Sequence, residues 1–272
     1  MCTFAFDFTA NKNKMRAITI LAKKIIPFKV RIFVRKANWR LKYFFLTFGK
    51  RYKNSVFCPI ANKEFKTFIK SGNDYITPSN GAKSRQRTVW LYLTKELNIL
   101  TEPLKILHIA PELSYFEILK KQKNIEYFAG DKMVAGYSNQ KGVDNVDLTG
   151  LNYENDFFDV IICNHVLEHI PDDKKAISEM FRALKKGGKA VVTVPMDENL
   201  EKTNENPNIT SPADRKKHFG QWDHLRMYST DIKQRFENEG FNTELIKYAD
   251  NFSANEFQKM RLCSDFIIVA EK

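Results

Sequence analysis

Short apolar runs alternate with amphipathic segments along the last two-thirds of the chain, from Lys105 to Lys272. The run at Phe157–Cys163 is apolar on both faces, which is typical of a central parallel strand. The segment 172–186 has helical periodicity and is expected to end at Gly187-Gly188. The alternation predicts an α/β fold with a doubly wound sheet. We expect strands at 105–110, 125–130, 143–148, 157–163, 189–194, 241–248 and 264–270, and helices at 112–121, 172–186 and 230–239.

The N-terminal part has a different pattern. Between Met15 and Tyr52, apolar and aromatic clusters alternate with basic residues. Such a segment can lie on an anionic membrane surface, with its aromatic side chains inserted and its lysines reaching the headgroups. The alternatives are a helical pair packed on the rest of the chain or on a dimer partner, or contact with RNA. Residues 1–53 are therefore interpreted as a basic amphipathic arm, with residues 15–53 as the candidate membrane contact.

The charge supports this division of the chain. The net charge is +12, but residues 12–53 carry 14 Lys/Arg and no acid, whereas residues 105–272 carry 23 basic and 27 acidic residues. The basicity belongs to the arm, so nucleic acid is not the expected substrate of the main domain. The four cysteines are scattered and form no CxxC pair, which favours a reducing, cytoplasmic setting.

Polar residues follow the first two strands expected in the main domain. Asp131 comes directly after the second strand, where an acid can accept hydrogen bonds from both hydroxyls of a ribose. The same residue could instead be the N-cap of the next helix. Ala110-Pro111-Glu112 follows the first strand and lacks the glycines that a pyrophosphate requires. Pro111 removes an N–H and Glu112 adds an anion, so NAD is disfavoured and a nucleoside cofactor without phosphate fits better.

The motifs of this region occur in the order seen in one large enzyme family. The chain resembles class I S-adenosylmethionine-dependent methyltransferases of the type 11 kind, and is most similar to a bacterial subgroup with HIAPE in place of the glycine-rich loop. The resemblance implies a Rossmann-like sheet of seven strands with an antiparallel last strand, and S-adenosylmethionine as cofactor. The motifs are HIAPE (108–112), YFAGD (127–131), VDLT (146–149), FDVIICNHVLEHIPD (158–172) and RALKKGGKAVVTVP (182–195).

The resemblance also implies cofactor contacts along the strand ends. The methionine end would lie against the turn after the first strand, the ribose against Asp131, and the adenine against the residues that follow. The fourth strand would contribute its last residues to the same pocket. The implied contacts are His108, Ala110, Pro111, Glu112, Asp131, Lys132, Met133, Asp147, Leu148, Asn164 and His165.

Residues 54–103 resemble a zinc ribbon that has lost its ligands. Relatives often carry two CPxC pairs in this region, and the corresponding segments here are Cys58-Pro59-Ile60-Ala61 and Thr77-Pro78-Ser79-Asn80. Three of four thiolates are missing, so these residues cannot form a tetrahedral zinc site. The region is interpreted as a metal-free relic with a helix leading into the methyltransferase domain, residues 104–272.

HVLEH, at His165–His169, also matches a zinc-protease pattern. That reading needs both histidines on one continuous helix, but Pro171 leaves little more than one turn. His169 is therefore interpreted as structural and His165 as part of the cofactor pocket. The sequence predicts no metal in this chain.

Candidate catalytic and substrate-binding residues follow the fifth strand, in a polar stretch too long for a simple connector. His224 and His165 are the candidate general bases, because an imidazole titrates near neutral pH. Asp223 could orient His224, and Arg226 could clamp an anionic group. Asp223, Arg226 and Tyr228 could equally form a structural cluster that fixes the loop. The predicted substrate-binding residues are His218, Asp223, His224, Arg226 and Tyr228.

The methyl acceptor is not specified by any motif. A small molecule or a glycan- or lipid-linked intermediate is the working expectation, and the basic arm favours an acceptor near a membrane. Two other functions stay open: a non-catalytic membrane-surface binding protein with a methyltransferase-like fold, and an RNA methyltransferase guided by the arm. The expected location is cytoplasmic, with the inner face of the membrane as a peripheral site.

Overall fold

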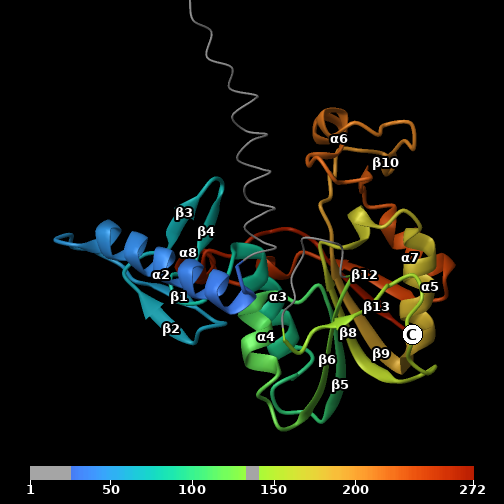
Figure 1. The fold of residues 1–272 in the computed structure, drawn as a ribbon, viewed down its shortest axis with the longest axis horizontal. Helices are drawn as coiled ribbons and strands as arrows, with labels where there is room; N and C mark the ends of the chain where they lie inside the picture. Colours follow the sequence, from blue (N-terminus) through green and yellow to red (C-terminus); the bar gives the residue numbers. More distant parts are fainter. Residues whose placement is uncertain (1–25, 133–140) are drawn as a thin grey trace, which may run out of the picture.

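The computed structural model describes residues 26–132 and 141–272. A seven-stranded sheet in the order β12-β13-β9-β8-β5-β6-β7 forms the centre of the main domain (Figure 1). β13 pairs antiparallel with both neighbours, and the other strand pairs are parallel. The doubly wound class, the seven strands and the antiparallel last strand are confirmed. The strands are β5 (Leu104–Ile109), β6 (Ile125–Asp131), β7 (Asp144–Asn145), β8 (Phe158–Asn164), β9 (Leu184–Thr193), β12 (Asn242–Ile246) and β13 (Ile267–Glu271).

Helices cover both faces of this sheet because alternate residues of each strand point to opposite sides. On one face, Val160 and Ile162 of β8 pack in a core with α3 (Ser84–Lys95), α4 (Leu113–Leu119) and α8 (Ala254–Met260). On the other face, Ile161 and Cys163 pack with α5 (Asp173–Ala183) and α7 (Ile232–Asn238). Cys58, Cys163 and Cys263 are free thiols, and Cys2 lies outside the described residues.

The end of the helix before β9 corrects one sequence prediction. α5 ends at Ala183 rather than Lys186, and Gly187-Gly188 lies inside β9. Leu184 already pairs with Phe158, and a register shift follows before Val160 pairs with Lys189. Gly187 has φ +77°, and a Cβ on Gly188 would lie 2.9 Å from the Lys185 carbonyl oxygen. The glycine pair therefore forms a bulge in a strand and is not a helix stop.

The described residues before α3 form a lobe beside the sheet (Figure 1). Within it, Thr77 Oγ1 lies 3.2 Å from the Cys58 sulfur, at the two positions of the ribbon motif. Arg87 of α3 is fully buried and donates to the carbonyls of Ala82 and Met260 at 2.8 and 2.7 Å, which joins the lobe to α8. The lobe consists of α2 (Phe28–Thr47) and the hairpins β1 (Val56–Cys58)–β2 (Lys63–Phe65) and β3 (Ile69–Ser71)–β4 (Asp74–Ile76).

The long polar stretch after β9 folds over the same end of the main domain as the loop that follows β8. It pairs β10 (Asn204–Glu205) with β11 (Arg226–Met227) and contains α6 (Pro212–Phe219). Two 3-10 helices complete the fold, η1 (Leu167–His169) after β8 and η2 (Tyr248–Asn251) after β12. Among the described helices, none is long and apolar enough to cross a membrane.

Candidate active site

A cavity of about 840 Å³ lies at the carboxyl ends of β5, β6 and β8. This is where open α/β sheets bind ligands, and the volume is in the range of small-molecule sites. The loop after β8 and the segment Gln221–Asp223 form its other wall. Its lining residues are Ile109, Ala110, Asp131, Lys132, Val146, Asp147, Leu148, Thr149, His165, Val166, His169, Ile170, Pro171, Asp172, Lys175, Gln221, Trp222 and Asp223.

Two acids line the cavity beside β6 and differ in their surroundings. Asp131 ends β6, and its partial burial raises the pKa of its carboxyl. Asp147 accepts a hydrogen bond from Lys132 at 2.6 Å and others from Thr149, and these bonds lower its pKa to about 2. Leu148 also lines the cavity. Asp131 therefore has no cation partner among the described residues and is left for a ligand, whereas Asp147 is already bound to Lys132.

The turn after β5 contains a residue in the left-handed backbone conformation, which is common for glycine and rare for other residues. Ala110 has φ +48° and donates its N–H to the Gly130 carbonyl at 2.7 Å. A left-handed conformation costs an alanine about 1 kcal/mol. The close approach of this turn to β6 holds it in place.

Behind this turn lies a closed polar network. His108 is fully buried, with Nε2 2.8 Å from Glu112 Oε2 and Nδ1 2.9 Å from the Tyr127 hydroxyl. Burial alone would raise the pKa of Glu112, but the hydrogen bond and charge of His108 outweigh it and lower that pKa. Asn164 at the end of β8 reaches the same Glu112 oxygen at 3.5 Å. The predicted contacts His108, Glu112 and Asn164 thus lie together beneath the turn rather than on the cavity wall.

His165 is the first residue after β8 and lines the cavity. Its φ is +54°, and its N–H donates to the Thr193 carbonyl at 2.7 Å. The left-handed turn ends the strand and breaks any helix that would join His165 to His169. The structure therefore excludes the continuous helix that the zinc-protease reading requires.

His224 is buried beneath the wall of the cavity. Nδ1 lies 2.9 Å from the Phe219 carbonyl oxygen, so this nitrogen carries the proton. Burial lowers the pKa of His224 below its ordinary value, which favours the neutral ring. The carbonyl of Phe219, rather than Asp223, orients this histidine: the Asp223 carboxylate lies 3.7 Å from Nδ1 of His169 and accepts from Gln221 at 2.8 Å.

Arg226 and Tyr228 are also buried, and their contacts are architectural. Arg226 donates to the carbonyls of Leu167, Ile170 and Pro171, which holds the loop after β8. The Tyr228 hydroxyl donates to Asp173 at 2.7 Å. These bonds support the structural alternative for both residues rather than direct substrate binding.

Other predicted residues lie away from the cavity wall or outside the described chain. His218 is exposed on α6, and its carbonyl oxygen accepts from Asn204. Pro111 follows the left-handed Ala110 and is half-buried, but it does not line the cavity. Met133 lies outside the described residues.

The sequence analysis did not predict several of the residues that line the cavity, and they come from three different elements. His169, interpreted as structural, is one-third exposed and faces the cavity. Trp222 and Gln221 line the opposite wall, and Lys175 reaches it from α5. The position of HVLEH at the carboxyl end of a strand was the available signal for His169. None was available for Trp222, because its place depends on how the loop folds back.

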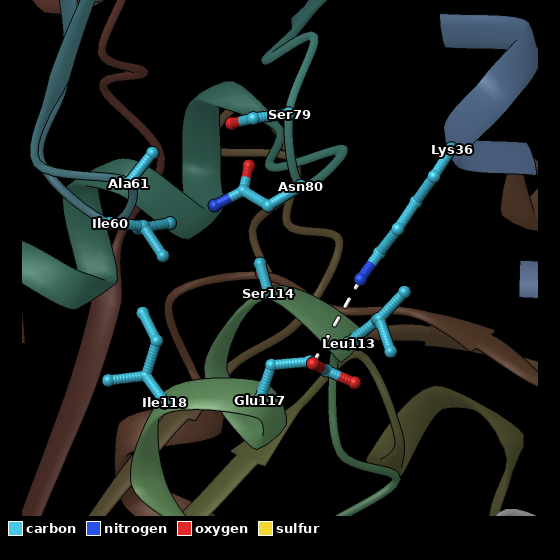
Figure 2. Close-up of a pocket in the computed structure, with 9 residues that line it drawn as sticks. All are labelled: Lys36, Ile60, Ala61, Ser79, Asn80, Leu113, Ser114, Glu117 and Ile118. Atoms are coloured by element: carbon cyan, nitrogen blue, oxygen red, sulfur yellow. Dashed lines mark ion pairs between the residues drawn. The ribbon is translucent and has the colours of Figure 1, made fainter. Parts of the chain in front are cut away.

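A second hollow, of about 280 Å³, lies between the lobe and α4 (Figure 2). Figure 2 shows Ile60, Ala61 and Asn80 on the lobe side facing Ile118 and Glu117 of α4. Lys36 of α2 reaches Glu117 across it at 3.9 Å. This hollow is open and smaller than the cavity at the strand ends, which is the stronger site candidate.

Several solved structures are similar to this chain. The chain is similar to an S-adenosylmethionine-dependent methyltransferase from Archaeoglobus fulgidus, at 16% identity over 68% of this chain and 93% of that one, with a TM-score of 0.44. It is similar to another from Mesorhizobium loti, at 13% identity over 68% and 100%, TM-score 0.44. The cyclase SpnF matches at 16% identity over 69% and 82%, TM-score 0.47. No curated protein matches in sequence.

The family model of the methyltransferase domain matches residues 105–246. The match begins in β5 and ends at the last residue of β12, so it includes every strand that borders the cavity. It covers more than half of the 272 residues. The chain therefore belongs to the methyltransferase-domain family.

Proposed function

We propose that this chain transfers a methyl group from S-adenosylmethionine to an acceptor that enters the cavity at the strand ends. The position of Asp131 carries the proposal, because its carboxylate lines the cavity at the end of β6, within reach of a ribose. Bound S-adenosylmethionine supplies a methyl group on a positively charged sulfur, which an acceptor takes by in-line displacement. The protein contributes mainly by holding the two reactants in line.

The turn after β5 suits this cofactor better than a dinucleotide. Pro111 has no N–H to offer a phosphate, and the lowered pKa of Glu112 keeps an anion beneath the turn at neutral pH. A phosphate at this place would be repelled, whereas an ammonium group would be attracted. The amino-acid end of S-adenosylmethionine carries such an ammonium.

The acceptor would occupy the half of the cavity between His165 and the Gln221–Asp223 segment. Trp222 is 42% exposed there and offers an aromatic face. His165 lines the same half, so it is placed to take a proton from the acceptor.

Calorimetric titration with S-adenosylmethionine and its demethylated product tests the proposal. The wild-type chain is expected to bind both, and Asp131→Ala to weaken binding at least tenfold by removing the ribose partner. Asp144→Ala is the matched control, because Asp144 is an exposed acid on the neighbouring β7. A folded wild-type sample that binds neither compound would overturn the proposal.

We also propose that the acceptor is presented at an anionic membrane surface, where α2 holds the protein. α2 carries six basic residues and no acid. Its exposed apolar side chains include Phe33, at 74%, and Phe45, at 68%. Large apolar side chains this exposed are costly in water and mark contact surfaces, and the interleaved cations favour anionic headgroups.

Sedimentation of the full chain with lipid vesicles tests this second part. Binding is expected to vesicles that contain phosphatidylglycerol, to weaken with salt, and to be lost in Phe33→Ser/Phe45→Ser. Leu100→Ser is the control, because Leu100 is an exposed apolar residue outside the arm. Salt-sensitive binding to RNA without vesicle binding would overturn the membrane proposal and favour a nucleic-acid role for the arm.

A further inference from the structure

Within residues 26–132 and 141–272, the carboxylate of Glu168 has no hydrogen-bond partner, although it is completely buried. His165 Nδ1 lies 3.2 Å from Oε1 and His169 Nε2 lies 4.0 Å from it, but neither makes a hydrogen bond with it. A buried carboxylate without hydrogen bonds costs several kcal/mol unless a cation compensates for it. The fold nevertheless holds Glu168 in η1, because its backbone carbonyl accepts from Leu225 N–H at 2.8 Å.

Two histidines next to Glu168 are oriented as metal ligands usually are. The Nδ1 atoms of His224 and His169 lie 2.9 and 3.3 Å from the carbonyl oxygens of Phe219 and Asp223. A carbonyl only accepts, so each Nδ1 carries a proton and Nε2 is the nitrogen of each ring that can bind a cation. Such backbone contacts fix the tautomer of metal-bound histidines.

The three side chains converge. Among the described residues, Glu168, His169 and His224 form the group whose donor atoms all lie within 4.8 Å of one another. The rings of His169 and His224 meet edge to face, with centroids 4.9 Å apart. Two imidazoles and one carboxylate are a ligand set typical of catalytic zinc, with metal–ligand bonds of about 2.0–2.2 Å. Such sites have three protein ligands and leave a fourth coordination position open.

We infer that Glu168, His169 and His224 hold a divalent transition-metal cation, with zinc as the best match, at the edge of the active-site cavity. Glu168 and His224 are buried, whereas His169 faces the cavity, so a cation held by the three side chains would lie at the edge of the cavity. This departs from the sequence prediction of a metal-free chain. The pair of His165 and His169 in the zinc-protease pattern is not the site, because His165 belongs to a different turn.

The site also indicates that the methyl acceptor carries a hydroxyl group, an inference that rests on the proposed function. A hydroxyl oxygen bound to the cation loses its proton more readily, and His165 is placed in the same cavity to take that proton. The oxygen then forms the bond to the methyl carbon while the carbon–sulfur bond breaks and its electron pair stays on sulfur. The cation keeps its oxidation state throughout.

Metal titration of the chelator-treated full chain tests the site without any methyl acceptor. With zinc alone as the probe, we expect one equivalent to bind in competition with a chromophoric chelator and to raise the melting temperature. Glu168→Gln, His169→Ala and His224→Ala should each weaken zinc binding at least 100-fold. His218→Ala is the control, because His218 is exposed on α6 and outside the cluster.

Several outcomes separate this inference from its rivals. No zinc uptake by the folded wild type, or full uptake by Glu168→Gln, would overturn it. Magnesium binding in place of zinc would also overturn it, because magnesium prefers oxygen ligands. Calorimetry with S-adenosylmethionine in the presence of a chelator tests the proposed function separately. Cofactor binding without metal uptake would reject the site alone, and metal uptake without cofactor binding would reject the function alone.

Discussion

β5 and β8 are neighbouring parallel strands that end in the same way but support opposite electrostatic arrangements. Each is followed at once by a left-handed residue that is not glycine, Ala110 after β5 and His165 after β8. Each is also followed by a glutamate shielded from water, Glu112 with 12% of its side chain exposed and Glu168 with none. Glu112 is hydrogen-bonded to His108, whereas the carboxylate of Glu168 has no hydrogen-bond partner among the residues that the structure describes. A closed pair stabilises the fold, and an open carboxylate of the same type is suited to bind a cation.

Breaking the closed pair should have the largest effect on stability. His108→Leu leaves Glu112 charged and buried, and also leaves the Tyr127 hydroxyl without its His108 partner. We expect a loss of about 3–5 kcal/mol in the free energy of unfolding, measured by urea denaturation. The control is His108→Leu/Glu112→Met, which removes both partners of the hydrogen bond and should recover most of the loss. An unchanged stability in the single variant would show that the pair is not a closed one.

Lowering the pH should have the next-largest effect on stability, and it should act through the pair of His108 and Glu112. Because the pKa of Glu112 is lowered in the folded chain, its stabilising contribution is complete above the ordinary glutamate value of 4.5. The contribution is lost as the pH falls from that value through the lower folded pKa. Urea midpoints measured against pH should therefore fall in acid for the wild type and less steeply for Glu112→Gln. Parallel curves would assign the acid sensitivity to other carboxyls.

Relaxing the left-handed turn after β5 should have a smaller, opposite effect. Ala110→Gly removes the steric cost of φ +48°, but it also stabilises the unfolded chain by making it more flexible. We expect a net stabilisation of about 0.5 kcal/mol, seen as a higher thermal midpoint. Ala129→Gly, in the regular strand β6, is the control and should destabilise. A loss of stability in Ala110→Gly would mean that the alanine methyl group contributes more than its strain costs.

The sequence predicted the sheet and the end of β6, but it did not predict the surroundings of Glu168, and the difference has a physical reason. Runs of apolar residues locate strands, so the sheet and the place of Asp131 at the end of β6 followed from local pattern alone. The glycine pair after Lys186 was misread because a bulge and a helix stop both require glycine. The cluster of Glu168 with His224 could not be predicted. His224 lies far along the chain, and it reaches η1 only because the long segment after β9 folds back. The Phe219 carbonyl that fixes its ring has no signature in the sequence.

Neutralising the open carboxylate should cause no loss of stability, and this absence of a loss is the sharpest test of the comparison. In metal-free protein, Glu168→Gln removes a buried charge that has no hydrogen bond to lose. We expect the free energy of unfolding to change by less than about 1 kcal/mol or to rise, in contrast to the large loss in His108→Leu. Urea denaturation of both variants in a chelator measures this directly. A loss of several kcal/mol in Glu168→Gln would mean that His165 or His169 already pairs with the carboxylate. The two strand ends would then be alike, and the reason for a cation at η1 would disappear.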